Sequence, residues 1–435
     1  MENKLEIVGK YCDDCKIFTT NIEEEALTMI YSVLNTKEFS GSRVRIMPDV
    51  HLGKNIVIGF SSNLTNYVSP SHVGVDIGCA VTLCITNASV NDEEFKLIEH
   101  RIKKEIPMGI NIHKKRMFEM KDFIKFMKSE YNKANSTWGE MINEFDISEK
   151  GFTELCRRIG MDEGTFYKSL GTLGGGNHFL ELGNLNGIYT FSIHSGSRNF
   201  GNKVCRYWEK IASSNQIDNK LFKEEVNKLK KSVKDKTTLP KLIAHLKSEY
   251  ESRVCSNGYL SGENMKGYIT DMVIAQAYAK YNHKIMIEII SNILLKINGG
   301  RVVDTIQSIH NYIDMNDHII RKGSIRSYSE ERLLIPLNMR DGIAICVGKS
   351  NSDWNYSAPH GAGRKLSRSK AKSTITMEEF EKSMEGIYTT SVCKGTLDES
   401  PMAYKDSDEI INLISDTCDI LEIVKPIINI KSSES

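Results

Sequence analysis

Ser71-His-Val-Gly-Val-Asp-Ile-Gly-Cys79 is the stretch around which the rest of the chain can be ordered. It places a carboxylate, Asp76, and a thiol, Cys79, three residues apart on a turn that also contains Gly74 and Gly78. Glycine lets the backbone bend where a Cβ atom would clash, so both side chains can point at one metal ion. The alternative is that Cys79 is a small buried core residue, which is the commoner fate of a cysteine.

Three histidines lie in similar glycine-rich or strand-end settings. His178 follows a triple glycine, His194 begins His-Ser-Gly-Ser-Arg, and His310 ends an apolar run. One Asp, one Cys and three His on loops after separate strands are enough for a site of two metal ions. Thiolate and imidazole suggest zinc, whereas carboxylate and phosphate chemistry tolerate manganese or magnesium, so the spacing does not select the metal.

The composition is that of a globular protein with a balanced charge. Of 435 residues, 40% are hydrophobic, and 57 Lys and Arg nearly balance 56 Asp and Glu. Nucleic-acid binding would therefore depend on local basic patches. The first residues do not resemble a signal peptide and no apolar run is long enough to span a bilayer, so we expect a cytoplasmic protein with no membrane partner.

The order of elements predicts an α+β (mixed α/β) fold. Short apolar runs broken by Gly, Pro and Asp predict buried sheets, and residues 270–297 predict a long central helix that ends at Gly299. Residues 203–252 predict a lysine-rich, amphipathic helical insertion. We expect a single large catalytic domain over residues 1–435.

Three further stretches contain candidate functional groups. Asp49 follows a proline and either converges on a site or caps a turn. The basic run His113-Lys-Lys-Arg116 either contacts phosphate or is a solvated surface. His360 lies among glycines in Ser357-Ala-Pro-His-Gly-Ala-Gly-Arg364, on a turn where a histidine is free to react.

Six blocks in this order resemble the signature blocks of the RtcB family of RNA-splicing ligases. They are Met47-Pro-Asp-Val-His-Leu-Gly-Lys54, Val73-Gly-Val-Asp-Ile-Gly-Cys79, Gly171-Thr-Leu-Gly-Gly-Gly-Asn-His-Phe-Leu-Glu181, His194-Ser-Gly-Ser-Arg198, His360-Gly-Ala-Gly-Arg364 and Met402-Ala-Tyr-Lys-Asp406.

The resemblance implies a GTP- and Mn²⁺-dependent ligase that joins an RNA 3′-phosphate or 2′,3′-cyclic phosphate end to a 5′-hydroxyl end. It implies that two Mn²⁺ ions are held by Asp76, Cys79, His178, His194 and His310. It also implies that His360 is the nucleophile that accepts GMP, that Asp49 orients it, and that Arg198 and Arg364 contact RNA phosphates. The implied guanylate contacts are Asn177, His178, Phe179, Leu180, Glu181, His310, Asn311, Pro336, Leu337, Asn338, Met339, His360, Gly361, Ala362, Gly363 and Lys431.

The chain departs from the family pattern near the expected guanine pocket. It has Pro336-Leu-Asn-Met339 where the family commonly has Pro-Gly-Ser-Met, and Ile343 where a family serine is expected. We therefore expect weaker discrimination of GTP over ATP. A metal-dependent phosphoesterase, an end-capping nucleotidyltransferase and an RNA-end-binding paralogue remain alternatives, and an archease-type activator is a candidate partner.

Overall fold

The β-structure consists of three sheets that are antiparallel except where β2 and β3 pair. The computed structural model describes residues 4–214, 219–232, 238–253 and 258–433. The first sheet has the order β1 (Leu5–Ile7), β2 (Asp14–Ile17), β3 (Arg43–His51), β4 (Ile58–Asn63), β10 (Ile319–Lys322) and β9 (Asn311–Ile313). The largest sheet has the order β12 (Arg332–Asn338), β13 (Gly342–Gly348), β15 (Cys418–Ile430), β6 (Phe179–Leu185), β7 (Ile188–Ser195), β5 (Ala80–Ser89) and β8 (Val302–Ile309). β11 (Ser324–Arg326) and β14 (Ser357–Pro359) form a separate pair.

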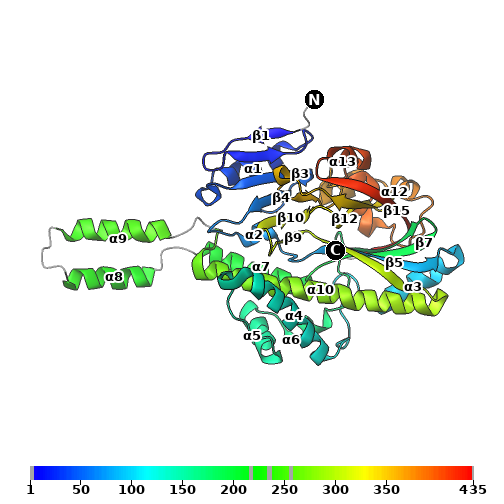
Figure 1. Ribbon diagram of the computed structural model, residues 1–435, viewed down its shortest axis with the longest axis horizontal. Coiled ribbons are helices and arrows are strands. Elements are labelled where there is room, and N and C mark those ends of the chain that lie inside the picture. Colours follow the sequence, from blue (N-terminus) through cyan, green and yellow to red (C-terminus); the bar gives the residue numbers. More distant parts are fainter. Residues whose placement is uncertain (1–3, 215–218, 233–237, 254–257, 434–435) are drawn as a thin grey trace.

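The helices surround these sheets, and the mixed α/β fold is thereby confirmed (Figure 1). The predicted central helix is α10, and it begins earlier than the sequence suggested, at Gly262, and ends at Asn298 before a left-handed Gly299. It packs on β5 and β7 and, on other faces, against α3, α4 and α7, which explains why it is apolar almost all round. The remaining helices are α1 (Glu24–Leu34), α2 (Pro70–Val73), α3 (Phe95–Glu105), α4 (Met120–Trp138), α5 (Glu149–Ile159), α6 (Glu163–Lys168), α7 (Arg198–Ser213), α8 (Asn219–Ser232), α9 (Leu239–Arg253), α11 (Arg368–Thr374), α12 (Met377–Ser383) and α13 (Ser407–Leu413).

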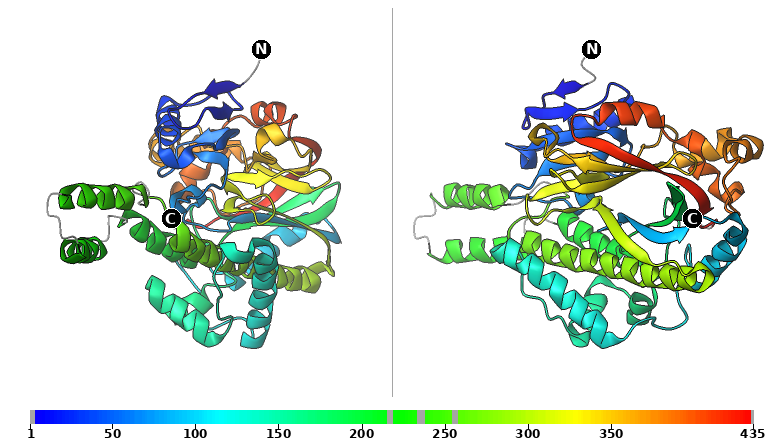
Figure 2. Two further views of the ribbon diagram at one scale, coloured as in Figure 1. Left: turned by 60° about the vertical axis from the view of Figure 1, so that its left-hand side comes forward. Right: turned by 45° about the vertical axis from the view of Figure 1, so that its right-hand side comes forward.

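The predicted 203–252 insertion covers two different parts of the molecule. Residues 203–213 belong to α7, whose buried side chains include Phe200, Val204 and Trp208 and join the main hydrophobic core. The two following helices, α8 and α9, lie side by side and project from one end of the molecule (Figures 1 and 2). None of the described helices is long and apolar enough to cross a bilayer.

The register of the large sheet brings several strand ends to one place. Ala80, at the start of β5, pairs both with Ser195 at the end of β7 and with Ile309 at the end of β8. Phe179, at the start of β6, pairs with His194. Because these neighbours are antiparallel, the start of one strand lies beside the end of the next. Cys79, His178 and His310 lie just outside the strands there, whereas His194, expected on a turn, lies within β7.

Asp49 lies within a strand and not on the turn that was one of its two expected settings. β3 continues to His51, but its pairing with β4 is interrupted between Ile46 and His51. A proline cannot donate to a sheet ladder and is tolerated at such a bulge. Bulges also redirect side chains, and here Asp49 is turned into the interior, fully buried.

A buried ion pair in the first sheet should contribute far more to stability than an exposed one. Arg321 on β10 is fully buried and contacts Asp317 Oδ2 at 2.7 Å, whereas the side chains of Arg332 and Asp304 are 43% and 37% exposed. Arg321→Ala leaves the mostly buried carboxylate of Asp317 without its cation, so we expect a loss of about 3–5 kcal/mol in the free energy of unfolding. Arg332→Ala should cost about 0–1 kcal/mol. Urea unfolding of both variants measures the difference, and equal losses would contradict it.

Candidate metal and nucleotide site

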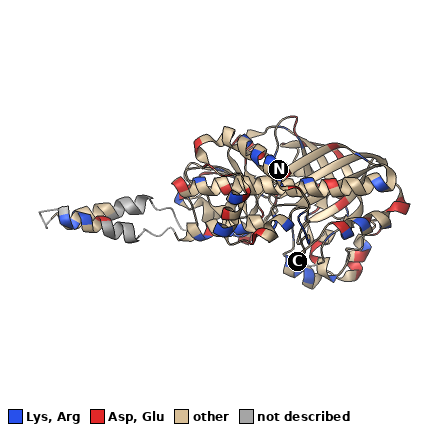
Figure 3. Cartoon of the chain, turned by 90° about the horizontal axis from the view of Figure 1, so that it is seen from below, with Lys and Arg blue, Asp and Glu red and all other residues tan. Residues whose placement is uncertain are grey.

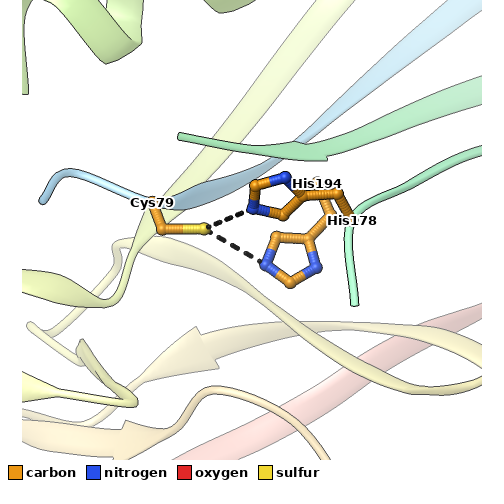
Figure 4. Close-up of side chains that lie close together, drawn as sticks. All are labelled: Cys79, His178 and His194. Carbon is orange, nitrogen blue, oxygen red and sulfur yellow. Dashed lines mark hydrogen bonds between the residues drawn. The ribbon is translucent and has the colours of Figure 1, made fainter. Parts of the chain in front are cut away.

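Three of the predicted metal ligands, Cys79, His178 and His194, surround one point at the converging strand ends, and His310 lies next to His194. The Sγ atom of Cys79 lies 3.5 Å from Nε2 of His178 and 3.4 Å from Nε2 of His194. Figure 4 shows these three side chains pointing toward one another. Nε2 of His310 lies 3.4 Å from Nε2 of His194. Metal bonds of about 2.0–2.3 Å at tetrahedral angles separate ligand atoms by about 3.3–3.6 Å, so the spacing fits a metal ion.

The fifth predicted ligand, Asp76, lies beside this cluster. Its Oδ2 atom is 2.9 Å from Nε2 of His178, and its side chain is 24% exposed, whereas the cysteine and histidines are buried. Nδ1 of His178 lies 3.0 Å from the carbonyl oxygen of Leu173, to which it can only donate. The Nε2 lone pair of His178 therefore faces the cluster, as it must in a metal ligand.

Burial sets the protonation of the cluster. It lowers the pKa of His194 and of His310 well below the usual range, so both rings are neutral and offer lone pairs. Burial opposes ionisation of Asp76, but the neighbouring His178, Cys79 and Arg198 side chains together outweigh it and lower that pKa to about 2. Burial raises the pKa of the Cys79 thiol, and a bound divalent cation would reverse this by stabilising the thiolate. The donor set therefore fits a divalent metal.

One side chain of the central helix ties together the loops on either side of the cluster. Asn282 Oδ1 accepts hydrogen bonds from the backbone N–H groups of Gly171 and Thr172. Its Nδ2 donates to the carbonyl oxygens of Thr172 and Gly196 and to Ser195 Oγ. These five bonds fix the glycine-rich loop before His178 to the residues after His194. The sequence analysis missed Asn282, although an asparagine within an apolar helix was a signal.

The predicted nucleophile is held by the predicted orienting carboxylate. Nδ1 of His360 lies 2.6 Å from Oδ2 of Asp49, which also accepts the backbone N–H of His360 at 3.1 Å. With Nδ1–H donating to Asp49, the Nε2 atom of His360 is unprotonated, as a nucleophile requires. The ring centroids of His360 and His310 are 4.9 Å apart, so the two sites adjoin. A Cβ atom on Gly363 would lie 2.2 Å from the carbonyl oxygen of Asp49, so only glycine fits there.

A cavity of about 540 Å³ adjoins His360 and contains most of the predicted nucleotide contacts. Four predicted contacts do not line it: His178 and His310 belong to the metal cluster, Asn311 donates to the carbonyl oxygen of Asp76, and Leu180 packs in a hydrophobic core. The predicted residues in its wall are Asn177, Phe179, Glu181, Pro336, Leu337, Asn338, Met339, His360, Gly361, Ala362, Gly363, Arg364 and Lys431. Ile343, expected near the guanine pocket, also lines this cavity, and wall residues with no predicted nucleotide contact include Glu23, His51, Arg368, Glu399, Tyr404 and Asn429.

A buried carboxyl group lies in the wall of this cavity. Glu181 Oε2 accepts a hydrogen bond from Asn429 Nδ2 at 3.0 Å, and Oε1 has no partner among the described residues. Burial raises the pKa of Glu181 to about 8, against the opposing effects of Asn429 and Lys431. An unpartnered polar atom at a cavity wall suits a polar ligand.

The predicted RNA-binding arginines are both bonded to protein groups. Arg364 contacts Glu399 Oε1 at 3.1 Å inside the cavity wall, and Lys431 contacts the same carboxylate at 3.2 Å. Arg198 donates to Thr172 Oγ1 and to the carbonyl oxygen of Gly109. Its backbone φ of +57° is unusual for a residue with a Cβ atom. This conformation begins α7 beside the metal ligands.

Comparison with known proteins gives one consistent result. A family model described as tRNA-splicing ligase RtcB matches residues 32–432. The RNA-splicing ligase RtcB of Escherichia coli strain K12 is 28% identical over 436 aligned residues, covering 96% of this chain and 97% of that protein. The tRNA-splicing ligase RtcB of Nanoarchaeum equitans is 26% identical, covering 85% and 83%. RNA-splicing ligase RtcB homolog 1 of Entamoeba dispar is 25% identical, covering 88% and 77%.

Removal of Cys79 should weaken metal binding while the fold survives. Even loss of a residue that only supports a ligand costs about 10–100-fold in metal affinity, so Cys79→Ala should lose at least about tenfold. Calorimetric titration with Mn²⁺ and the thiolate absorption band of bound Co²⁺ measure the change. Cys84→Ala is the matched control, because Cys84 is buried on β5 in a hydrophobic core. Unchanged affinity in Cys79→Ala would exclude the thiolate as a ligand.

Glu181 should make the protein less stable as pH rises from about 4.5 to about 8. The pKa of this group is raised from 4.5 to about 8 in the folded protein, so in this window the folded chain keeps a proton that the unfolded chain releases. Stability falls with pH wherever the folded state binds more protons. Glu181→Gln removes this contribution, so its free energy of unfolding should fall less between about pH 5 and about pH 8. Parallel urea titrations compare the two proteins, and identical pH slopes would refute the shift.

Proposed function

The chain belongs to the tRNA-splicing ligase RtcB family, and on that premise we propose that it joins an RNA 3′-phosphate or 2′,3′-cyclic phosphate end to a 5′-hydroxyl end. The observation that supports this most strongly is the position of His360. Its ring lies between the carboxylate of Asp49 and the ring of His310, and it faces a cavity large enough for a nucleotide.

Two Mn²⁺ ions are the metals we propose, held by Asp76, Cys79, His178, His194 and His310. Bound there, divalent cations would neutralise charge on phosphoryl oxygens and bring the reacting groups into line. The neutral imidazoles and the ionised Asp76 leave the cluster ready to bind cations.

His360 performs the first chemical step in this proposal. Its Nε2 lone pair attacks the α-phosphorus of GTP, a P–N bond forms, and the bond to pyrophosphate breaks. Asp49 accepts the Nδ1 proton in a hydrogen bond, keeps the ring in this tautomer and stabilises the positive charge that develops on it. Because Asp49 is fully buried, water does not screen the interaction between its carboxylate and the His360 ring.

The next two steps transfer GMP and then release it. An oxygen of the RNA 3′-phosphate attacks the guanylyl phosphorus, and the P–N bond to His360 breaks. The 5′-hydroxyl then attacks the activated RNA phosphorus, a phosphodiester forms, and GMP leaves. Each step is an in-line phosphoryl transfer, so positioning and charge neutralisation supply the catalysis.

The base pocket of this proposal has one polar wall and one apolar wall. Glu181 and Asn429 supply polar atoms, whereas the side chain of Asn338 is bonded to Asp341 and Ser407 and that of Ile343 is buried. A pocket with fewer free hydrogen-bonding groups discriminates less between bases. Competition between GTP and ATP in the labelling assay below measures that discrimination.

The decisive test is labelling with α-labelled GTP and Mn²⁺. Wild-type protein should form a covalent adduct that is labile to acid and stable to alkali, as a P–N bond is, and peptide mapping should locate it at His360. His360→Ala should form no adduct but should still seal RNA whose 3′-phosphate has been guanylylated beforehand. His100→Ala, an exposed histidine on α3, is the control and should label normally. A labelled His360→Ala protein, or a label mapped elsewhere, would refute the mechanism.

A further inference from the structure

The basic run that the sequence analysis left open belongs to a loop fixed beside the metal cluster. We define the basic loop as residues 109–117. Gly109 N–H donates to the carbonyl oxygen of Gly174 at 2.8 Å. Nε2 of His113 lies 3.0 Å from the carbonyl oxygen of Gly171. The backbone N–H of His113 donates to Lys168. The loop is therefore fastened at Gly109 and His113 to the segment that leads into His178.

Arg198 and Gly174 connect the basic loop to the metal ligands. A Cβ atom on Gly174 would lie 1.9 Å from Nη1 of Arg198 and 2.6 Å from Nδ1 of His178, so these groups pack directly on one another. Arg198 Nη2 donates to the carbonyl oxygen of Gly109 at 3.1 Å. Asp76 is the predicted ligand whose side chain reaches solvent. The basic loop, Arg198 and Asp76 thus form a continuous wall at the exposed side of the cluster.

The outer surface of the basic loop combines cations with exposed apolar groups. Lys114, Lys115 and Arg116 are exposed in succession, and Ile110 and Met117 are 82% and 43% exposed. Neither Lys114 nor Lys115 has an acidic partner in the described part of the chain, whereas Arg116 is turned toward Phe118. Ile110 is a large apolar side chain exposed to solvent beside these cations. A basic patch that contacts only solvent does not require such a side chain.

We propose that the basic loop binds the single-stranded RNA segment whose 3′-phosphate ends at the metal cluster. Lys114 and Lys115 contact its backbone phosphates and Ile110 contacts the face of an unpaired base. Single strands are bound by a positive surface along the backbone together with apolar contacts to bases. The balanced charge of the whole chain provides no long-range attraction, so a local patch is required. This inference rests on the proposed ligase function and adds the path of one substrate strand.

The projecting pair of helices α8 and α9, called the hairpin below, supplies a matched control. Lys228, Lys230 and Lys231 on α8 are also exposed, and the hairpin extends away from the body of the molecule (Figure 3). The basic-loop variant is K114A/K115A/R116A and the control is K228A/K230A/K231A. Both remove three positive charges from exposed positions, so they change the net charge equally. Lys115→Glu, a single exposed change, serves as a second basic-loop variant.

The measurement is fluorescence anisotropy of a labelled single-stranded RNA with a 3′-phosphate, over a range of salt concentrations. The basic-loop variant should bind at least about tenfold more weakly, and its slope of log affinity against log salt should be shallower by about 1.4, since each of the two lost phosphate contacts removes about 0.7. The control should bind as wild type does. Labelling of His360 by α-labelled GTP should be equal in all proteins, which shows that the basic loop acts on RNA and not on the nucleotide.

Two outcomes would overturn the proposal. Equal losses in the basic-loop and hairpin variants would show a general charge effect, and a loss confined to RNA carrying a 5′-hydroxyl and no 3′-phosphate would assign the loop to the other strand. Binding requires no turnover, so failure of the wild-type protein to form an adduct or join RNA would refute the proposed function separately.

Discussion

The antiparallel register of β5 with its two neighbours is the constraint on which the site depends. Ala80 pairs with Ser195 on one side and Ile309 on the other, so the residues that precede β5 meet those that end β7 and follow β8. A slip of one residue in either pairing would turn the whole strand over. The hydrophobic side chains of β5 and β7, which are buried along most of their length, make such a slip costly. Packing of the hydrophobic core thereby positions the polar side chains at these strand ends, which contribute little to the core themselves.

Burial of this polar cluster has an energetic cost that the central helix offsets. Unpartnered polar groups in a dry interior cost about 1–3 kcal/mol each. α10 supplies Asn282, which satisfies backbone atoms on both flanking loops, and His283, which contacts Thr82 Oγ1 at 2.8 Å and the carbonyl oxygen of Ser195 at 2.9 Å. Both residues lie on the buried part of α10, so they link the packing of the core to the geometry of the proposed metal ligands. Burial also keeps His194 and His310 neutral, which is the state that can ligate.

The proposed nucleophile, His360, comes to the candidate metal cluster from a different part of the fold. His360 follows β14 in the small sheet, and Asp49 comes from the bulged part of β3 in the first sheet. The site therefore lies where the three sheets meet, and the 540 Å³ cavity opens between His360 and the start of β6. Groups on separate rigid elements can be held at fixed distances without lengthening any loop, which suits a reaction that depends on in-line positioning.

The sequence by itself determined the mixed fold, the long central helix with its glycine stop, and the residues that converge on one site. It could do so because these features are local: periodicity, glycine turns, and ordered motif blocks whose resemblance also named the family. Only the tertiary structure decided that Asp49 lies within a bulged strand, that residues 203–213 belong to the core helix α7, and that Leu180 faces a hydrophobic core. Only the structure revealed Asn282, Asn429 and Glu399 as partners of the site. Their contacts join residues up to 248 positions apart, and such contacts follow from packing and register, which local pattern does not encode.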